Sequence, residues 1–399
     1  MGRTKRKFVG SMMRLSKSLK KPLFQVASLM PKGFTNKMFV NEFKTLYRFL
    51  WDDLESKYIE YKRMDEGRKK KGFPRIYFFP APADYILERS NAILSNTRFK
   101  HFKGTYISND EISAKREILI QESNRKILIR QAKLESNLQL VQEVTPSYTN
   151  YFIKEYFRLK RNKPDDVTSR YVLLQEASRY KCTSTVVFLH KVNASERNFQ
   201  LRHFAFLTLQ KFGEKEVRLR KNRKGKKRVG DNLIPEKIES PIALLNHIYK
   251  SQLEKYKKYD IFLSHSSTNK ELILSVKSIL NSLNFNVYVD WINDKEALKR
   301  SMTNTDTAQV IIERLKSCNA LMFVYSKESL NSLWTPWEIG YFHSLKGKIC
   351  VYYPDEIVES LIPAYINIYP KVFFKENGFV VKTNEEIIPI NKWINLKIS

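Results

Sequence analysis

Residues 259–264 read YDIFLS, and this short run decides the fold of the second half of the chain. The run is largely apolar on both faces of an extended chain, which is typical of a strand buried in a parallel sheet. Similar runs follow at intervals that leave room for a helix: NVYVDW (286–291), ALMFVYS (320–326), KICVYY (348–353) and KVFFK (371–375). This alternation predicts a doubly wound α/β domain with a parallel sheet.

Polar side chains follow three of these predicted strands. They are Ser264, His265, Ser266 and Ser267 after the first strand, Asp290, Trp291, Asn293 and Asp294 after the second, and Tyr325 and Ser326 after the third. In a doubly wound sheet, ligands bind beyond the carboxyl ends of the strands, where the winding direction reverses. We therefore expect a binding site at this edge of the sheet.

The segment SLNSLWTPWEIGYF (329–342) carries two tryptophans, a proline and a single carboxylate, Glu338. An apolar core has little use for a carboxylate, so Glu338 is either a solvated bystander or a working group. Ser332 is a predicted helix N-cap. Glu338 lies four residues after Trp334, which places both side chains on one face of the predicted helix.

Taken together, YDIFLSHSS, VYVDW and SLWTPWEIGYF resemble a TIR (Toll/interleukin-1 receptor) domain of the kind found in bacterial immune proteins. The resemblance covers about residues 255–375 and implies a flavodoxin-like sheet. Enzymes of this family cleave the nicotinamide–ribose bond of NAD⁺, with the glutamate of a Ser-x-Trp-x-x-x-Glu pattern as the catalytic residue. Here that pattern falls on Ser332, Trp334 and Glu338, so NAD⁺ is the expected substrate and no cofactor or metal is expected.

A single carboxylate is chemically sufficient for this reaction. Most glycosidases need a second carboxyl group to protonate the leaving oxygen. Nicotinamide leaves as a neutral molecule from a pyridinium, so it needs no such proton, and one carboxylate can stabilise the developing ribose cation. Trp334 and Trp337 provide either an apolar wall and stacking face for a ring of NAD⁺ or ordinary core packing.

Ser264, His265, Asp290 and Trp291, which lie at the ends of the first two predicted strands, are candidate substrate-binding residues. His265 is either a general base or a hydrogen-bonding residue of the turn after the strand, and Asp290 either orients the ribose or caps the following loop. Residues 291–304 correspond to the loop through which TIR domains contact a neighbouring protomer. Within it, Lys299 or Arg300 could bind the NAD⁺ pyrophosphate, unless both are simple surface charges.

Nearly all of the formal net charge of +30 lies in the first part of the chain. Residues 1–250 contain 53 Lys+Arg and 25 Asp+Glu, whereas residues 251–399 contain 18 and 16. Such an excess attracts polyanions, so nucleic acid, an acidic protein or an anionic membrane are candidate partners, unless the charge only keeps the surface soluble. Candidate phosphate-binding residues are Lys224, Lys226, Lys227 and Arg228, and candidate base-stacking residues are Tyr77, Phe78 and Phe102.

Residues 1–214 are predicted to be a basic, mainly helical sensor or partner-binding region. One long helix should start at Asn109 or Asp110 and reach about Val144, before Pro146. Its apolar stripe consists of Ile120, Ile127, Leu134, Leu138 and Val141. Further helices are predicted over 168–190 and 196–212, and a short strand is predicted to begin near residue 75. Residues 215–254 are the predicted linker, and residues 255–399 the predicted TIR domain.

The remaining composition narrows the class of protein. Cys182, Cys318 and Cys350 are far apart and form no CxxC pair, which indicates reduced thiols in a cytoplasmic protein. No apolar run is long enough to span a membrane, and the basic N-terminal segment is too interrupted by charge for a signal peptide. An amphipathic helix lying on a membrane surface remains an alternative for that segment.

Two functions from different classes fit these observations. The first is an NAD⁺ hydrolase or cyclase that acts as an effector or signal producer in bacterial antiphage immunity, regulated by the N-terminal region and by TIR assembly. The second is a non-enzymatic adaptor whose TIR domain recruits other TIR domains, with a basic region that binds nucleic acid or a membrane.

Overall fold

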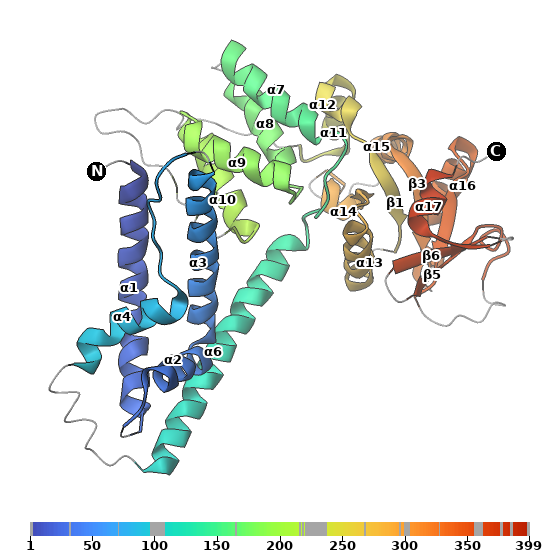
Figure 1. The fold of residues 1–399 in the computed structure, drawn as a ribbon. Coiled ribbons are helices and arrows are strands. Elements are labelled where there is room, and N and C mark those ends of the chain that lie inside the picture. Colours follow the sequence, from blue (N-terminus) through green and yellow to red (C-terminus); the bar gives the residue numbers. More distant parts are fainter. Residues whose placement is uncertain are drawn as a thin grey trace. The chain divides into compact units, whose positions relative to one another are not determined.

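The computed structural model describes residues 3–31, 33–70, 72–95, 108–163, 166–214, 217, 219, 238–266, 269–294, 297–298, 304–326, 328–354, 362–375, 378–383 and 386–396. The chain divides into two compact units, Met1–Lys133 and Leu134–Ser399 (Figure 1). Residues 134–254 therefore belong to the same unit as the sheet. The predicted bounds at 214 and 255 stay predictions, since much of the predicted linker lies outside the described residues.

The first unit consists of helices. They are α1 (Arg3–Leu29), α2 (Asn36–Leu46), α3 (Arg48–Lys69), α4 (Pro82–Leu94) and the first part of α6 (Asn109–Leu138). Leu15, Leu19 and Leu23 recur every four residues along α1, and all three are buried in a core with Phe39 and Phe43. The apolar side of α1 is thus used for packing within the chain.

Asp65 organises the segment that follows α3. Its carboxylate accepts the backbone N–H groups of Ile76, Tyr77 and Phe78 at 2.9, 3.2 and 3.0 Å. The sequence predicts the start of a short strand here, but the structure has none, because a side chain satisfies the donors that a neighbouring strand would otherwise pair. Phe78 adopts a positive φ of 45°, which is strained for a residue with a side chain.

The second unit starts with helices that partly match the prediction. They are α7 (Thr149–Asn162), α8 (Val167–Ala177), α9 (Thr183–Ser195), α10 (Phe199–Lys211), α11 (Pro241–Lys250) and α12 (Gln252–Tyr256). Helix α11 lies inside the predicted linker, and α12 begins in it and ends two residues beyond its predicted bound. Leu244, Ile248 and Leu253 of these two helices are buried, so this part of the linker is packed structure.

Two predicted helices end earlier or break because their backbones pair with each other. Helix α6 ends at Leu138, and the predicted helix 168–190 is interrupted between α8 and α9. The N–H of Gln142 donates to the carbonyl of Arg179 at 2.7 Å, and the N–H of Lys181 donates to the carbonyl of Gln142 at 2.8 Å. These bonds form an isolated parallel bridge between Gln142 and Tyr180, which a helix at either segment would exclude.

A seven-stranded sheet in the order β2-β1-β3-β4-β5-β6-β7 occupies the rest of the second unit. Its first five strands along the chain are β1 (Tyr259–Ser264), β2 (Val287–Tyr288), β3 (Cys318–Val324), β4 (Ile349–Tyr352) and β5 (Lys371–Lys375). All five pair in parallel, as predicted. Strands β6 (Gly378–Lys382) and β7 (Ile387–Pro389) were not predicted, and they pair antiparallel. The predicted parallel sheet thus carries two further antiparallel strands at one edge, because connections this short permit only antiparallel pairing.

The helices of this domain cover both faces of the sheet. They are α13 (Lys270–Ser282), α14 (Asp290–Asn293), α15 (Thr305–Ser317), α16 (Trp334–Leu345) and α17 (Ile390–Asn395). Alternate residues of β1 face opposite cores: Ile261 packs with residues of α13 and α17, whereas Phe262 packs with residues of α15 and α16. Ser264 has the same parity as Phe262, so its side chain points toward α16.

The role of Asp65 leads to a first prediction. Asp65→Ala leaves three backbone donors without their acceptor, so we expect it to destabilise the first unit by about 2–4 kcal/mol. Hydrogen exchange of the amides of Ile76, Tyr77 and Phe78 in the full-length protein should accelerate. Asp52→Ala, which removes an exposed carboxylate from the same helix, is the control, and equal exchange in the two variants would contradict this role.

Candidate active site

Glu338 lies on the inner face of α16 and is only 9% exposed. Its Oε2 accepts a hydrogen bond of 2.6 Å from the Oγ of Ser264, the last residue of β1. Thr335, Ile339 and Phe342 share the buried face of α16, and this spacing of three and four residues directs Glu338 inward. The structure thus brings together a serine and a carboxylate that are 74 residues apart.

Ser332 holds the start of the same helix. Its Oγ accepts the backbone N–H groups of Trp334 and Thr335 at 3.3 and 3.4 Å. These bonds satisfy two of the free donors at the helix N-terminus, but the N-cap residue itself is Leu333, one position after the predicted Ser332. Ser332 therefore acts on the site through the placement of α16.

The surroundings of Glu338 change its acidity. Burial raises the pKa of this carboxyl to about 8, although the hydrogen bond from Ser264 acts in the opposite direction, and the negative charge of Asp290 adds to the rise. A carboxyl group with a pKa near neutrality can take up or release a proton at physiological pH. Such a shift in a group held by one specific partner is typical of functional sites.

His265 connects the end of β1 to α14. Its Nδ1 lies 2.9 Å from the carbonyl oxygen of Leu263, and its Nε2 lies 2.9 Å from the indole Nε1 of Trp291. A carbonyl only accepts and an indole N–H only donates, so the ring carries its proton on Nδ1 and is neutral. Both ring nitrogens are occupied in this conformation, which favours the hydrogen-bonding alternative for His265 over the general base.

Asp290 stands at the beginning of α14, next to this pair. Its Oδ1 accepts the backbone N–H of Trp291 at 2.7 Å and lies 3.7 Å from Nε2 of His265. The side chain of Asp290 is 48% exposed, so it remains accessible to a ligand while it holds the backbone N–H of Trp291. Both alternatives predicted for Asp290 are compatible with this geometry.

Trp334 and Trp337 occupy the first turn of α16. Their rings meet edge to face with centroids 5.6 Å apart, and Trp337 also stacks on Tyr341. Both tryptophans are half-buried and pack against the core on this side of the sheet. They therefore combine core packing with an accessible aromatic surface, and the two alternatives are not mutually exclusive.

Other predicted residues lie elsewhere. Asp294 is buried in an ion pair with Arg314. Tyr77 is buried in the core of the first unit, which corrects its assignment as a base-stacking residue, whereas Phe78 is 71% exposed. The remaining candidates lie outside the described residues: Lys224, Lys226, Lys227, Arg228, Lys299, Arg300, Ser267 and Phe102.

Sequence reasoning missed the partners of Asp294. Arg314 sits one turn after Val310 on the buried face of α15, and a long cation among apolar helix positions was the available signal. Its acidic partners come from distant segments, so no local pattern identified them.

No group of three or more His, Cys, Asp or Glu side chains in the described parts of the chain is placed to hold a metal ion. Cys318 and Cys350 are buried free thiols, and Cys182 is a half-buried one. Within the same described ranges, no helix has both the length and the apolar character needed to cross a membrane.

Comparison with known proteins yields two relatives, whereas no family model matches the chain. A protein of Cytobacillus dafuensis named "Putative cyclic ADP-D-ribose synthase TIR2" is 32% identical over 366 residues, which span 89% of this chain and 93% of that protein. A protein of Bacillus cereus (strain MSX-D12) named "Probable 3' cyclic ADP-D-ribose synthase ThsB'" is 38% identical over 158 residues, which span 38% of this chain and 76% of that protein.

The raised pKa of Glu338 predicts a pH-dependent effect on stability. Burial raises this pKa from the usual 4.5 to about 8, so between these pH values the unfolded chain binds fewer protons than the folded chain. The carboxyl therefore destabilises the fold progressively as the pH rises through this window. Glu338→Gln keeps the shape without the charge and should raise the unfolding free energy at pH 8 by up to about 4 kcal/mol, with little gain at pH 4.5.

The measurement is urea unfolding of the full-length protein across this pH range. Glu271→Gln in α13 is the matched control, because it removes an exposed carboxylate of the same domain and should change stability little at any pH. A gain from Glu338→Gln that does not vary with pH would contradict the assignment of the raised pKa.

Proposed function

The chain belongs to the TIR-domain family that includes these two cyclic ADP-D-ribose synthases, and we propose that it cleaves the nicotinamide–ribose bond of NAD⁺ with Glu338 as the catalytic residue. The single observation that carries this proposal is the buried Glu338 carboxyl held by Ser264 at the edge of the sheet where the strands end. That edge is where doubly wound sheets bind their ligands.

The reaction requires a group that stabilises positive charge on the ribose. When the bond between the anomeric carbon and nicotinamide breaks, its electron pair moves to the pyridinium nitrogen, and the ribose acquires oxocarbenium character. Ser264 holds Oε2 of Glu338, and in this proposal Oε1 is the oxygen that contacts the ribose, where the ionised carboxyl stabilises the cation. The half-buried Trp334 and Trp337 supply an apolar wall for a ring of the substrate.

The fate of the ribose cation determines the product. Attack by water forms ADP-ribose, whereas attack by a hydroxyl group elsewhere in the same molecule closes a ring and forms cyclic ADP-ribose. In either case the attacking oxygen forms the new C–O bond and loses its proton, and a carboxyl with a pKa of about 8 can accept that proton. The names of both relatives support cyclisation, so we propose a cyclic ADP-ribose as the product.

We further propose that this activity serves antiphage defence in the bacterial cytoplasm. In this scheme the product is a signal, TIR domains of several chains assemble, and the N-terminal region responds to a trigger. The loop around Arg300 is the proposed contact with a neighbouring protomer, and its cationic side chain the proposed partner of the NAD⁺ pyrophosphate.

The catalytic role of Glu338 is tested by nicotinamide release from NAD⁺. We expect Glu338→Gln to reduce the rate by a factor of at least about 10²–10³, because the amide does not stabilise the cation. Ser264→Ala should retain partial activity, and its pH–rate profile should shift to higher pH, since Ser264 holds the pKa of Glu338 down. Glu271→Gln should match the wild type.

The assay covers the widest accessible range of protein concentrations, because an assembly-dependent enzyme gains activity per chain as concentration rises. Undiminished turnover by Glu338→Gln would refute the catalytic assignment. A wild-type chain that folds and binds other TIR domains, yet releases no nicotinamide at any concentration, would support the adaptor alternative.

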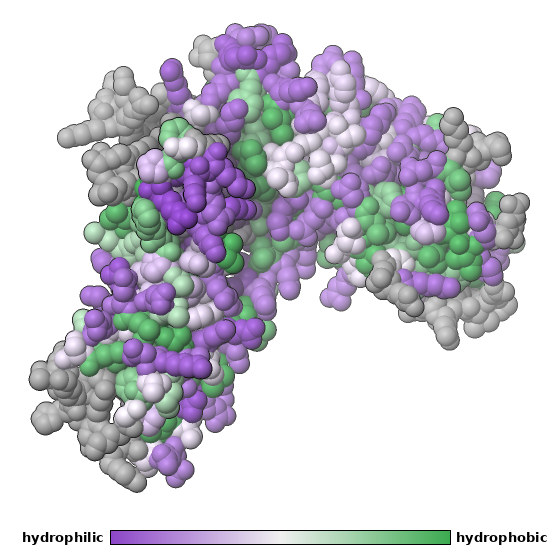
Figure 2. Space-filling view, in the orientation of Figure 1, coloured by the Kyte–Doolittle hydropathy of each residue, from purple (hydrophilic) through white to green (hydrophobic). Residues whose placement is uncertain are grey.

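A second proposal concerns the trigger, and it rests on charge and exposed rings in the first unit. Residues 1–133 contain 30 Lys+Arg and 13 Asp+Glu. Phe73 and Phe78 are 58% and 71% exposed, and the guanidinium of Arg68 lies 5.6 Å from the ring of Phe73. Figure 2 shows hydrophobic residues set among strongly hydrophilic ones over the helices of this unit. We propose that this surface binds single-stranded nucleic acid, with bases stacked on Phe78.

The strained backbone of Phe78 supports this choice of residue. A positive φ at a phenylalanine persists only where surrounding contacts hold it, and here the Asp65 carboxylate fixes the N–H of Phe78 and of the two residues before it. The result is an aromatic ring held outward on an ordered segment, which reduces the entropy lost when a base stacks on it.

Nucleic-acid binding is tested by salt titration of the full-length protein with single- and double-stranded DNA and RNA. Affinity should fall steeply between about 50 and about 200 mM salt, because each phosphate contact releases counterions. Phe78→Ala should weaken single-stranded binding about 10-fold or more, whereas Phe24→Ala, which removes an exposed ring of α1, should not. An affinity that changes neither with salt nor with Phe78→Ala would contradict this proposal. The positive charge would then serve only to keep the surface soluble.

A further inference from the structure

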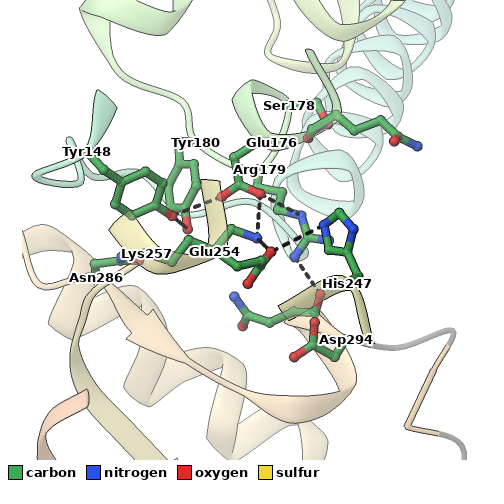
Figure 3. Close-up of polar contacts among 12 residues, drawn as sticks. Tyr148, Glu176, Ser178, Arg179, Tyr180, His247, Glu254, Lys257, Asn286 and Asp294 are labelled. Atoms are coloured by element: carbon green, nitrogen blue, oxygen red, sulfur yellow. Dashed lines mark hydrogen bonds and ion pairs between the residues drawn. The ribbon is translucent and has the colours of Figure 1, made fainter. Parts of the chain in front are cut away.

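A cluster of buried charges lies in the second unit, around Tyr259 at the start of β1 (Figure 3). Its carboxylates and cations come in equal number: Glu176, Glu254 and Asp294 with Arg179, Lys257 and Arg314. We call these six residues the charge cluster. Glu176 and Arg179 come from α8 and the turn after it, Glu254 and Lys257 from α12 and its end, Asp294 from the end of α14, and Arg314 from α15.

Each charge in the cluster has an opposite partner. Arg314 binds Asp294 through two hydrogen bonds of 2.7 and 3.1 Å and Glu254 through one of 2.6 Å. Lys257 pairs with Glu254 and, at 2.9 Å, with Glu176. Although burial alone would raise the pKa of Glu254 and of Asp294, the nearby cations hold both pKa values below the usual range. Glu254 and Asp294 are therefore ionised at neutral pH.

Fully buried ion pairs add little net stability compared with apolar packing, but they enforce one geometry, because any displacement leaves a buried charge without its partner. Such pairs therefore fix how the segments that carry the charges lie relative to one another. In this chain, the ion pairs connect the helices that precede β1 with the segment that follows β2.

That segment is α14, a helix of four residues with both ends fixed. At its C-terminal end, Nη1 of Arg179 donates to the carbonyl oxygen of Asn293 at 2.5 Å, and Asp294 is held by Arg314 and by the hydroxyl of Tyr288 at 2.9 Å. At its N-terminal end are Asp290 and Trp291, the latter bonded to His265. A helix of this length spans only roughly 6 Å, so a shift at one end reaches the other.

We propose that Arg179 is a positioning residue for the active site: through Asn293 it fixes α14 and thereby the placement of Asp290 and Trp291 beside Glu338. This inference rests on the proposed function. Arg179 belongs to the helical segment before the sheet, so that segment contributes a residue that positions the active site. Misplacement of about 1 Å in a catalytic site can reduce the rate by as much as about 10²-fold.

Arg179 is the member of the cluster whose substitution gives a clear result. Its side chain is 37% exposed, whereas those of Arg314 and Lys257 are almost fully buried. If Arg179 is removed, Glu176 keeps Lys257 and the hydroxyl of Tyr148, each at 2.9 Å. Arg179→Ala therefore leaves no buried charge without a partner, and the fold should persist.

The experiment compares Arg179→Ala and Arg179→Lys with the wild type in the full-length protein. Lys181→Ala is the matched control, since Lys181 is a partly exposed cation two residues away that pairs with Glu143 instead of contacting α14. For each variant we would measure the unfolding midpoint, nicotinamide release with kcat and KM separated, and hydrogen exchange of residues 289–294.

Arg179→Ala should accelerate exchange in 289–294 and lower kcat about 10-fold or more, with a smaller change in KM and an unfolding midpoint like that of Lys181→Ala. Arg179→Lys keeps a donor for the Asn293 carbonyl and should recover most of the protection. Unchanged exchange in Arg179→Ala would overturn the proposal, and so would faster exchange with unchanged kcat. If even the wild type cleaves no NAD⁺, the proposed function fails, while the exchange data still decide whether Arg179 orders α14.

Discussion

The parallel pairing of β1 with β2 and β3 is the constraint on which the rest of the second unit depends. Because Ser264 pairs in register with Phe323 and Phe262 with Tyr288, the three strands end at the same edge of the sheet. The turn after β1, the start of α14 and the first turns of α16 must therefore converge there. The hydrogen bond between Ser264 and Glu338 is a consequence of this register, and a shift of one residue would turn Ser264 to the opposite core.

Glu338 and Asp294 show how opposite surroundings give two buried carboxyl groups opposite properties. Asp294 accepts two hydrogen bonds from one guanidinium, and its pKa lies below the usual range. Glu338 has one hydroxyl as donor and a neighbouring negative charge, and its pKa rises to about 8. The first arrangement fixes geometry, whereas the second keeps a reactive group at the expense of stability, as is common where a fold carries chemistry.

The sequence predicted those parts of the structure that depend on local patterns. Runs apolar on both faces identified the five parallel strands, and the Ser-x-Trp-x-x-x-Glu pattern of the TIR resemblance identified Ser332 and Glu338. Features set by distant partners were not predictable in this way. The segment after residue 75 is not a strand because Asp65, ten residues earlier, takes its donors, and α6 stops short because Gln142 pairs with Tyr180. Strands β6 and β7 are short and partly exposed, so they lack the buried pattern that identifies a strand.

The position of Glu254 and Lys257, only a few residues before β1, has a consequence for how this protein can have evolved. A recombination event that joined the sheet to an unrelated upstream sequence at Tyr259 would remove Glu254, one of the two carboxylates that hold the buried Arg314, and would leave Asp294 as its remaining partner. It would also remove Arg179, which donates to the Asn293 carbonyl at the end of α14. We therefore expect that helices α7 to α12 and the sheet were inherited together. Recombination points in the history of this protein should lie upstream of these helices.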